Sequence, residues 1–260
     1  MARESSARQG RLLAMLRERG EAGVAALCAT LAVSEATVRR DLAALESAGR
    51  VVRTFGGARL AAEGSLLERT FGRKRQQMRR EKEAIAREAA RLVSPGMTLA
   101  LDSGTTVWRV AAALKDKAPL TILTTALAAV EELGAVAGMS IFCTGGRFRP
   151  DNLDFVGPAA VAAFARLRAD IAFVGGDGLR VGKGLYSADQ ESAAVLSAIG
   201  DCAARRVAVL DNTKIGAHGM FLGLPQDRID YLVTDSGLDN ETWSKLEAQG
   251  VKVTLVEVPA

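Results

Sequence analysis

The sequence predicts an α/β protein in two parts: a small N-terminal helical domain with a strand hairpin, and a three-layer domain around a mostly parallel sheet. Helical apolar spacing fills residues 11–48, whereas short apolar runs alternate with helical stretches beyond residue 83. Charge also divides the chain, because residues 1–82 carry 17 Lys/Arg and 9 Asp/Glu while the remainder carry 17 and 21. A basic module on an acidic body is typical of proteins that bind nucleic acid.

Two short helices are expected before residue 32. Leucines recur at helical spacing over residues 11–19, and a second apolar face lies within residues 24–31. Only Ala32 and Val33 separate the second helix from a third. Helices joined by so tight a turn form a helix-turn-helix.

The third helix is predicted to begin at Ser34, whose hydroxyl can accept a backbone N–H of the first turn. Val33 and Val38 have the spacing of a hydrophobic staple, and Leu42 and Leu45 continue the buried face. A polar, basic helix start is typical of a recognition helix in the DNA major groove. The residues predicted to contact DNA from this helix are Ser34, Glu35, Ala36, Thr37, Arg39 and Arg40.

Gly49 is predicted to end this helix, and a β-branched strand over residues 50–55 follows it. A Gly-Gly turn and a return strand to residue 60 would complete a wing. Arg53 and Arg59 would flank the tip of the wing, where they can meet phosphates. Phe55 fits the wing core and a DNA contact equally well.

Single features of this region also have plain structural explanations. Adjacent arginines such as Arg39 and Arg40 more often form a solvated helix face, and only the combined cap, staple, turn and wing favour DNA. Asp41 cannot attract phosphate, so we expect it to form a structural salt bridge with a nearby arginine. We expect Cys28, which lies among small apolar residues, to be a small buried hydrophobe.

Composition excludes several other classes of protein. The three cysteines are widely spaced, which fits neither a disulfide framework nor a metal-binding motif. With His218 as the only histidine, most zinc sites and a Ser-His-Asp triad are excluded. We find no signal peptide and no apolar run long enough to span a membrane, so a soluble, cytoplasmic protein is expected.

The predicted domain boundaries are 1–58 for the winged helix-turn-helix, 59–82 for a basic linker and 83–260 for the α/β domain. Seven basic residues lie between Arg69 and Lys82. They fit a basic arm near the DNA backbone and a solvated linker helix about equally well.

The α/β domain is predicted from continuous apolar strands that alternate with helices, a pattern typical of a parallel sheet covered on both faces. The predicted strands are 97–101, 120–124, 140–143, 171–174, 207–210, 231–234 and 251–256. The predicted helices are 107–114, 126–135, 158–167, 190–199 and 241–249, preceded by a helix face between residues 84 and 92.

Ligands of such sheets bind at the carboxyl ends of the strands, where this chain has glycine-rich turns with polar side chains. Backbone N–H groups at a helix start, threonine hydroxyls and cations would suit a small phosphorylated sugar or polyol. Carboxylates there could accept its hydroxyl groups. The predicted effector-binding residues are Asp102, Ser103, Gly104, Thr105, Thr106, Gly145, Gly146, Arg147, Asp211 and Lys214. The sequence has neither a Walker A motif nor a dinucleotide fingerprint, so no cofactor and no metal are expected.

The N-terminal residues resemble the DeoR family of bacterial transcription regulators. The matching positions are Val33, Ser34, Thr37, Val38, Arg39, Arg40, Asp41, Leu42, Glu46, Gly49, Arg53, Gly56, Gly57 and Ala58. Residues 102–106, 145–147, 155–161, 170–179 and 211–216 are similar to the sugar-phosphate sensor domain of the same family. This resemblance implies a fold like that of ribose-5-phosphate isomerase and the CoA-transferases, and a phosphorylated sugar that changes the affinity for DNA.

The sequence departs from the family pattern at three places. Thr125 stands where an asparagine is usual, and Ser192 and Leu196-Ser197 stand within a motif that usually carries an acidic and a basic contact. These departures affect the effector contacts rather than the DNA-binding motif.

The main hypothesis is therefore a DNA-binding transcription regulator, a repressor of a carbohydrate operon, acting on a double-stranded operator as a dimer or tetramer. The alternative is a sugar-phosphate isomerase with an appended DNA-binding domain, in which Asp102, Asp211 and Lys214 would move a proton. A third hypothesis is a DNA-compaction protein without sequence preference.

Overall fold

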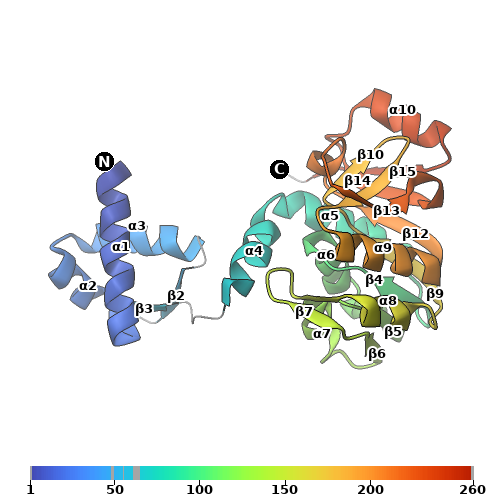
Figure 1. Ribbon diagram of the computed structural model, residues 1–260. Helices are drawn as coiled ribbons and strands as arrows, with labels where there is room; N and C mark the ends of the chain where they lie inside the picture. Colours follow the sequence, from blue (N-terminus) through green and yellow to red (C-terminus); the bar gives the residue numbers. More distant parts are fainter. Residues whose placement is uncertain (1, 48–49, 55, 61–64, 259–260) are drawn as a thin grey trace. The chain divides into compact units, whose positions relative to one another are not determined.

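The computed structural model describes residues 2–47, 50–54, 56–60 and 65–258 (Figure 1). The chain forms two compact units, Met1–Lys74 and Arg75–Ala260. The boundaries predicted from the sequence, at residues 58 and 82, stay a prediction.

Unit 1 is a helix-turn-helix with a three-stranded sheet in the order β1-β3-β2. Its elements are α1 (Ala2–Arg19), β1 (Glu21–Gly23), α2 (Val24–Leu31), α3 (Glu35–Ser47), β2 (Val51–Thr54) and β3 (Gly57–Leu60). The three predicted helices and the wing hairpin are present. The sequence analysis missed β1, because three residues between two helices carry no strand periodicity.

The core of unit 1 is formed by the apolar faces of its three helices. Val38 and Leu42 are fully buried and Leu45 is 3% exposed, as the helical spacing predicted. Val33 packs against the same cluster, and Cys28 is half-buried beside it. The predictions for Gly49 and Phe55 lie outside the described residues.

The chain passes from unit 1 to unit 2 within a helix. The division between units 1 and 2 falls within α4 (Ser65–Gln76), and α5 (Arg79–Ala90) follows after a sharp turn. Met78, at that turn, has a φ of 49°, in the left-handed region.

Unit 2 is built on a seven-stranded sheet in the order β15-β14-β12-β9-β4-β5-β6, in which every pairing is parallel. Its strands are β4 (Thr98–Leu101), β5 (Leu120–Thr124), β6 (Met139–Cys143), β9 (Ala169–Val174), β12 (Ala203–Val209), β14 (Tyr231–Asp235) and β15 (Lys252–Val256). Each of the seven predicted strands is one of these.

Helices cover both faces of this sheet (Figure 1). The helices α5, α6 (Thr105–Ala113) and α7 (Leu127–Leu133) pack on one face with Leu99, Leu101 and Phe173. The other face, with Ala100 and Ala172, is covered by α8 (Pro158–Phe164), α9 (Gln190–Cys202) and α10 (Asn240–Ala248). The predicted three-layer α/β fold class is confirmed.

Several short elements were not predicted. A two-stranded ribbon and a three-stranded antiparallel sheet lie outside the main sheet. Unit 2 also contains short 3-10 helices. These elements are β7 (Arg147–Arg149), β8 (Asp154–Val156), β10 (Gly178–Arg180), β11 (Gly184–Ser187), β13 (Phe221–Pro225), η1 (Lys115–Lys117), η2 (Asn212–Lys214) and η3 (Gln226–Arg228). Most of them are only three or four residues long, too short to show a periodic pattern, and β13 (FLGLP) is interrupted by a glycine and ends at a proline. None of the described helices has the length and apolar character that crossing a membrane requires.

Candidate nucleic-acid interface and effector site

The start of α3 is fixed by its capping residue. The backbone N–H of Thr37 donates to Oγ of Ser34 at 3.3 Å, and the two hydroxyl oxygens are 2.9 Å apart. Ser34 is therefore the predicted N-cap, and it satisfies an N–H group that the helix leaves open. The polar face of α3 follows directly and is open to solvent.

Four of the predicted DNA contacts on α3, namely Glu35, Ala36, Arg39 and Arg40, are exposed, while Thr37 is half-buried. Arg39 donates from Nε and Nη2 to Oε1 of Glu35, at 2.8 and 2.5 Å. Exposed pairs one helical turn apart contribute only about 0.3–0.5 kcal/mol. The guanidinium of Arg39 is thus held only weakly by Glu35.

Asp41 has the structural role that the sequence predicted. Its carboxylate accepts from Nε of Arg8 at 2.5 Å and from Nη2 at 3.1 Å. The Asp41 side chain is 4% exposed and that of Arg8 is 20% exposed. The pair links α1 to α3 and so fixes the direction in which α3 presents its polar face.

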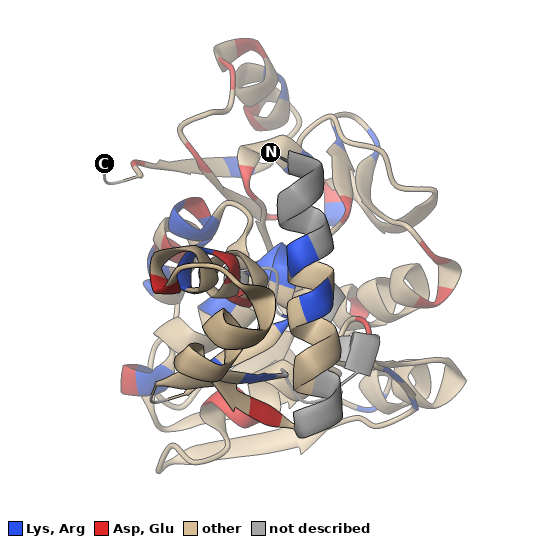
Figure 2. Ribbon diagram, turned by 90° about the vertical axis from the view of Figure 1, so that its left-hand side faces the viewer, with Lys and Arg blue, Asp and Glu red and all other residues tan. Residues whose placement is uncertain are grey.

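The wing carries the other two predicted contacts, and both are exposed. Arg53 pairs across the hairpin with Ala58, and Arg59 pairs with Val52. Directly opposite residues share a face of a hairpin, and neighbouring residues alternate between faces, so Arg53 and Arg59 lie on opposite faces. Figure 2 shows the basic residues in blue on the helices and on the wing.

In unit 2, the loops after β4, β9 and β12 lie side by side at one edge of the sheet. These strands are neighbours and run parallel, so their carboxyl ends meet at that edge. The loops carry the predicted residues 102–104 and 211–214. The sheet therefore brings together two of the three predicted effector segments, as expected for a site at the carboxyl ends of strands.

Asp102 holds the first of these loops rather than presenting its carboxyl group to solvent. Oδ2 accepts from the backbone N–H of Gly175 at 3.1 Å, and Oδ1 accepts from that of Ser103 at 2.7 Å. Burial raises the pKa of the Asp102 carboxyl from 3.8 to about 7, although these two N–H groups oppose the rise. Asp102 thus ties the loop after β4 to the loop after β9.

Helix α6 starts from this loop. Gly104, with a φ of 113°, is its N-cap, and Thr105 and Thr106 form its first turn. Both threonines are nearly buried, at 8% and 9% exposure. The first N–H groups of a helix have no partner within the helix and attract anions.

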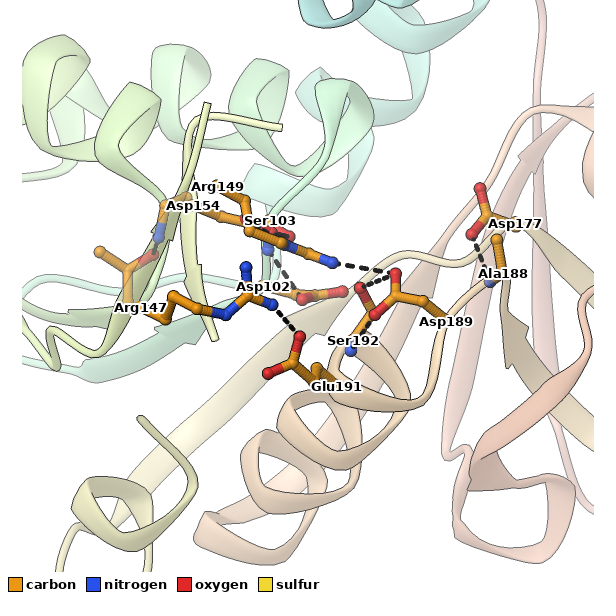
Figure 3. A network of polar contacts seen from close by, with 12 residues as sticks. Asp102, Ser103, Arg147, Arg149, Asp154, Asp177, Ala188, Asp189, Glu191 and Ser192 are labelled. Carbon is orange, nitrogen blue, oxygen red and sulfur yellow. Dashed lines mark hydrogen bonds and ion pairs between the residues drawn. The ribbon is translucent and has the colours of Figure 1, made fainter. Parts of the chain in front are cut away.

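A polar network extends from Ser103 to α9 (Figure 3). Oγ of Ser103 donates to the buried Asp154 at 2.7 Å, and Arg149 donates to both oxygens of that carboxylate at 2.9 and 2.7 Å. Arg149 also donates to Asp189 at 2.9 Å. Burial lowers the pKa of the Arg149 guanidinium, but the two carboxylates outweigh burial and raise it overall.

Asp189 belongs to both the network and a helix start. It is the N-cap of α9, and its carboxylate accepts the backbone N–H and the hydroxyl of Ser192 at 2.9 and 2.7 Å. Burial raises its pKa, but the bonds from Ser192 and Arg149 together lower it below the ordinary value. Asp189 is therefore held as a carboxylate next to Arg149.

Arg147 lies two residues before Arg149 in β7, and both reach toward the start of α9 (Figure 3). Arg147 forms an ion pair with Glu191, in which the two side chains are 61% and 41% exposed. The third predicted segment thus reaches the network through α9. Gly146 lies so near Val156 that an added Cβ would come within 2.7 Å of the Val156 carbonyl oxygen, which explains the glycine.

The loop after β12 holds the last two predicted residues. Asp211 is 1% exposed and accepts from the hydroxyl of Thr213; the nearer oxygen of its carboxylate lies 3.8 Å from Nζ of Lys82. Lys214 is half-buried at the end of η2, and no ion pair to it occurs among the described residues. Asp235 holds this loop by accepting the backbone and side-chain N–H groups of Asn212 at 2.8 and 2.6 Å.

The departures from the family pattern have structural consequences. Leu196 is 1% exposed in the core, so it presents nothing to a ligand. The backbone N–H and the hydroxyl of Ser192 both donate to Asp189, the N-cap of α9. Thr125 is buried, and its hydroxyl has no hydrogen-bond partner among the described residues.

The residues that the sequence analysis missed are the partners of the predicted ones. They are Lys82, Arg149, Asp154, Asp189, Glu191 and Asp235. The alternation of Arg147 and Arg149 signals a strand with two arginines on one face, but the positions of the acidic partners depend on the topology. A cavity of about 390 Å³ lies nearby, and none of the predicted effector residues lines it; its lining includes Asn212, Ile215, Gly216, Leu238, Asp239 and Thr242.

Two family models match the chain. Residues 8–64 match the DeoR-like helix-turn-helix domain, and residues 77–236 match the DeoR C terminal sensor domain. The first match lies in unit 1 and the second in unit 2.

Proteins similar to this chain are regulators by name. An uncharacterized HTH-type transcriptional regulator, YgbI of Escherichia coli strain K12, is 32% identical over 95% of this chain and 96% of its own length. The transcriptional repressor AccR of Agrobacterium fabrum is 31% identical over 88% of this chain and 89% of its own. Among solved structures, ribose 5-phosphate isomerase A from Methanocaldococcus jannaschii matches with a TM-score of 0.40 and 18% identity over 54% of this chain and 55% of its own.

Proposed function

The chain belongs to the DeoR family of transcription regulators, and on this basis we propose that it is a repressor whose affinity for an operator is changed by a phosphorylated sugar or polyol. The observation that carries the proposal is the start of α3, where a capped, exposed, basic helix turn is held by the Arg8–Asp41 pair. A relative named as a transcriptional repressor supports the sign of the regulation.

For DNA recognition, we assign base contacts to Thr37, Arg39 and Arg40 and phosphate contacts to Arg53 and Arg59. Ser34, Glu35 and Ala36 line the same helix start and complete the contact surface. One such unit buries too little surface for tight specific binding, so a dimer or tetramer on repeated half-sites is part of the proposal. Because much of the affinity comes from phosphate neutralisation, binding should fall steeply with salt.

For effector recognition, we assign the phosphate to the first turn of α6, with Arg147 and Lys214 as cations. Asp102 and Asp211 hold the loops through contacts within the protein, and their contacts with ligand hydroxyl groups remain part of the proposal. Glycine turns at 104 and at 145–146 let backbone N–H groups approach the ligand. The carbohydrate class rests on this combination of anion-binding groups with nearby carboxylates and hydroxyls.

The experiment that tests the effector half is equilibrium binding of ribose 5-phosphate, fructose 6-phosphate and inorganic phosphate to the full chain, with turnover followed in the same samples. We expect one sugar phosphate to bind without turnover. Turnover would favour the isomerase hypothesis, and equal affinity for inorganic phosphate and every ester would remove the sugar from the proposal.

A further inference from the structure

The turn between α4 and α5 is held in an unusual conformation. Met78 adopts a left-handed φ of 49° without being a glycine. Such a conformation persists only where surrounding contacts hold it. The contacts on either side of this turn lead to the two loops assigned to the effector.

The first contact is made by Lys82, in the first turns of α5. Its Nζ donates to the carbonyl oxygen of Gln77, in the α4–α5 turn, at 2.8 Å. The same Nζ lies 3.8 Å from Oδ2 of Asp211, and the two side chains are only 5% and 1% exposed. Because both side chains are buried, solvent screens their interaction little.

The second contact is a stack of cations on an indole ring. Cζ of Arg75, near the end of α4, lies 4.6 Å from the centroid of the Trp108 ring, and Cζ of Arg109 lies 4.4 Å from it. Trp108 belongs to α6, and its backbone N–H donates to the carbonyl oxygen of Gly104 at 2.9 Å. The indole is thus one helical turn from the loop after β4.

The two contacts lead to different loops, and Arg109, which stacks on Trp108, also pairs with Glu83 of α5 at 3.2 Å. One begins in the last turn of α4 and the other in the α4–α5 turn, and α4 contains the division between the DNA-binding unit and unit 2. We propose that the α4–α5 turn couples effector occupancy to DNA binding, with Lys82, Arg75 and Trp108 as positioning residues. The inference rests on the proposed function and specifies how the effector site would change DNA binding.

The physical basis is a competition for charge. A phosphate dianion at the first turn of α6 or beside Lys214 adds negative charge near Lys82. The ammonium group of Lys82 is then attracted to the ligand as well as to Asp211. A shift of α6 moves Trp108 relative to Arg75. A ligand that favours one arrangement of these contacts changes the population of α4 directions by its differential affinity.

Trp108 supplies its own readout, since the chain has two tryptophans and Trp243→Phe leaves only the stacked one. We would titrate this variant with a DNA fragment from the protein's own promoter region, in the absence and presence of ribose 5-phosphate and fructose 6-phosphate. Operator DNA is expected to change the Trp108 emission. Arg75→Ala should abolish that change and reduce the effect of the sugar phosphate on operator affinity at least about fivefold, since couplings of this kind are typically 5–150-fold.

Arg73→Ala is the matched control, because Arg73 is an exposed arginine on the same helix and no ring contact to it occurs among the described residues. It should keep both responses. Lys82→Arg retains the buried charge and tests the other contact without leaving Asp211 unpaired. Two results would overturn the inference. One is Trp108 emission that does not change when operator DNA is added, and the other is an Arg75→Ala protein whose emission and operator affinity respond as in the wild type.

Failure of the proposed function gives a different result. If no sugar phosphate changes the operator affinity of the wild-type chain, the effector assignment is wrong. The operator-induced emission of Trp108 and its loss in Arg75→Ala still test the coupling element in that case.

Discussion

Arg39 forms two hydrogen bonds to a single carboxylate oxygen of Glu35, one turn earlier on the exposed face of α3. The side chains are 53% and 60% exposed, so the ion pair contributes little free energy. It holds the guanidinium in place at the N-terminal end of the helix, where a recognition helix meets base edges. If Arg39 contacts a base, as we propose, the contact replaces this weak pair with Glu35.

Replacement of Arg39 by alanine should weaken operator binding sharply without unfolding the protein. Loss of one bidentate base contact costs about 1–3 kcal/mol, or roughly 5- to 150-fold in dissociation constant. Fluorescence anisotropy with labelled operator measures this change. Arg91→Ala, which removes an arginine that is 77% exposed in unit 2, should bind almost normally. Normal operator retention by Arg39→Ala would contradict the assignment of α3.

Replacement of Asp41 by alanine should act on stability. The substitution removes the Asp41 carboxylate from the half-buried guanidinium of Arg8. We expect this loss to lower the free energy of unfolding of unit 1 by about 1–3 kcal/mol. Urea denaturation followed by far-UV circular dichroism measures this. Glu46→Ala, at an exposed position on the same helix, is the control. If Asp41→Ala unfolds at the wild-type urea concentration, the pair does not hold α1 against α3.

Asp102 should make the stability of unit 2 depend on pH. Its pKa is higher in the folded protein, about 7 against 3.8, so its favourable contribution is complete below pH 3.8 and is lost as pH rises toward 7. The rise corresponds to at most roughly 4 kcal/mol. Asp102→Asn, which cannot ionise, should therefore gain stability relative to the wild type at pH 8 and lose that advantage near pH 4. Urea midpoints that differ by the same amount at both pH values would show that Asp102 does not titrate in this range.

Arg147 should matter for the effector and not for the operator. Its ion pair with Glu191 is largely exposed, so a phosphate dianion can take the guanidinium from Glu191. Arg147→Ala should raise the dissociation constant of the sugar phosphate about tenfold, as expected for the loss of a charge-assisted contact. Calorimetric titration measures this value, with Arg166→Ala, an exposed arginine after α8, as the control. Equal loss in both variants would point to net charge instead of a contact.

The sequence predicted the framework of the fold because its signals are local. The seven strands of the main sheet are continuous apolar runs, and the cap at Ser34 depends on residues three positions apart. The resemblance of residues 33–58 to one family was confirmed by the matching family models. The ribbon formed by β7 and β8 was missed because three-residue strands have no periodicity to read.

The partners within the site depend on distant segments. Arg149 meets Asp189, 40 residues later, and Ser103 meets Asp154, 51 residues later. Asp102 and Asp211 were predicted to accept ligand hydroxyls, a role that remains a prediction, while their present partners are Gly175 and Lys82. The spacing of residues along the chain does not reveal that a carboxylate at a strand end already has a partner within the protein.

The measurement that tests the central claim most directly is a gel-shift titration on DNA from the protein's own promoter region, repeated with a panel of sugar phosphates. We predict tight binding to one fragment, weakened by added salt and abolished by a single phosphate ester. Equal binding to every fragment, unaffected by any ester, would contradict the account and leave a DNA-binding protein without a sensor.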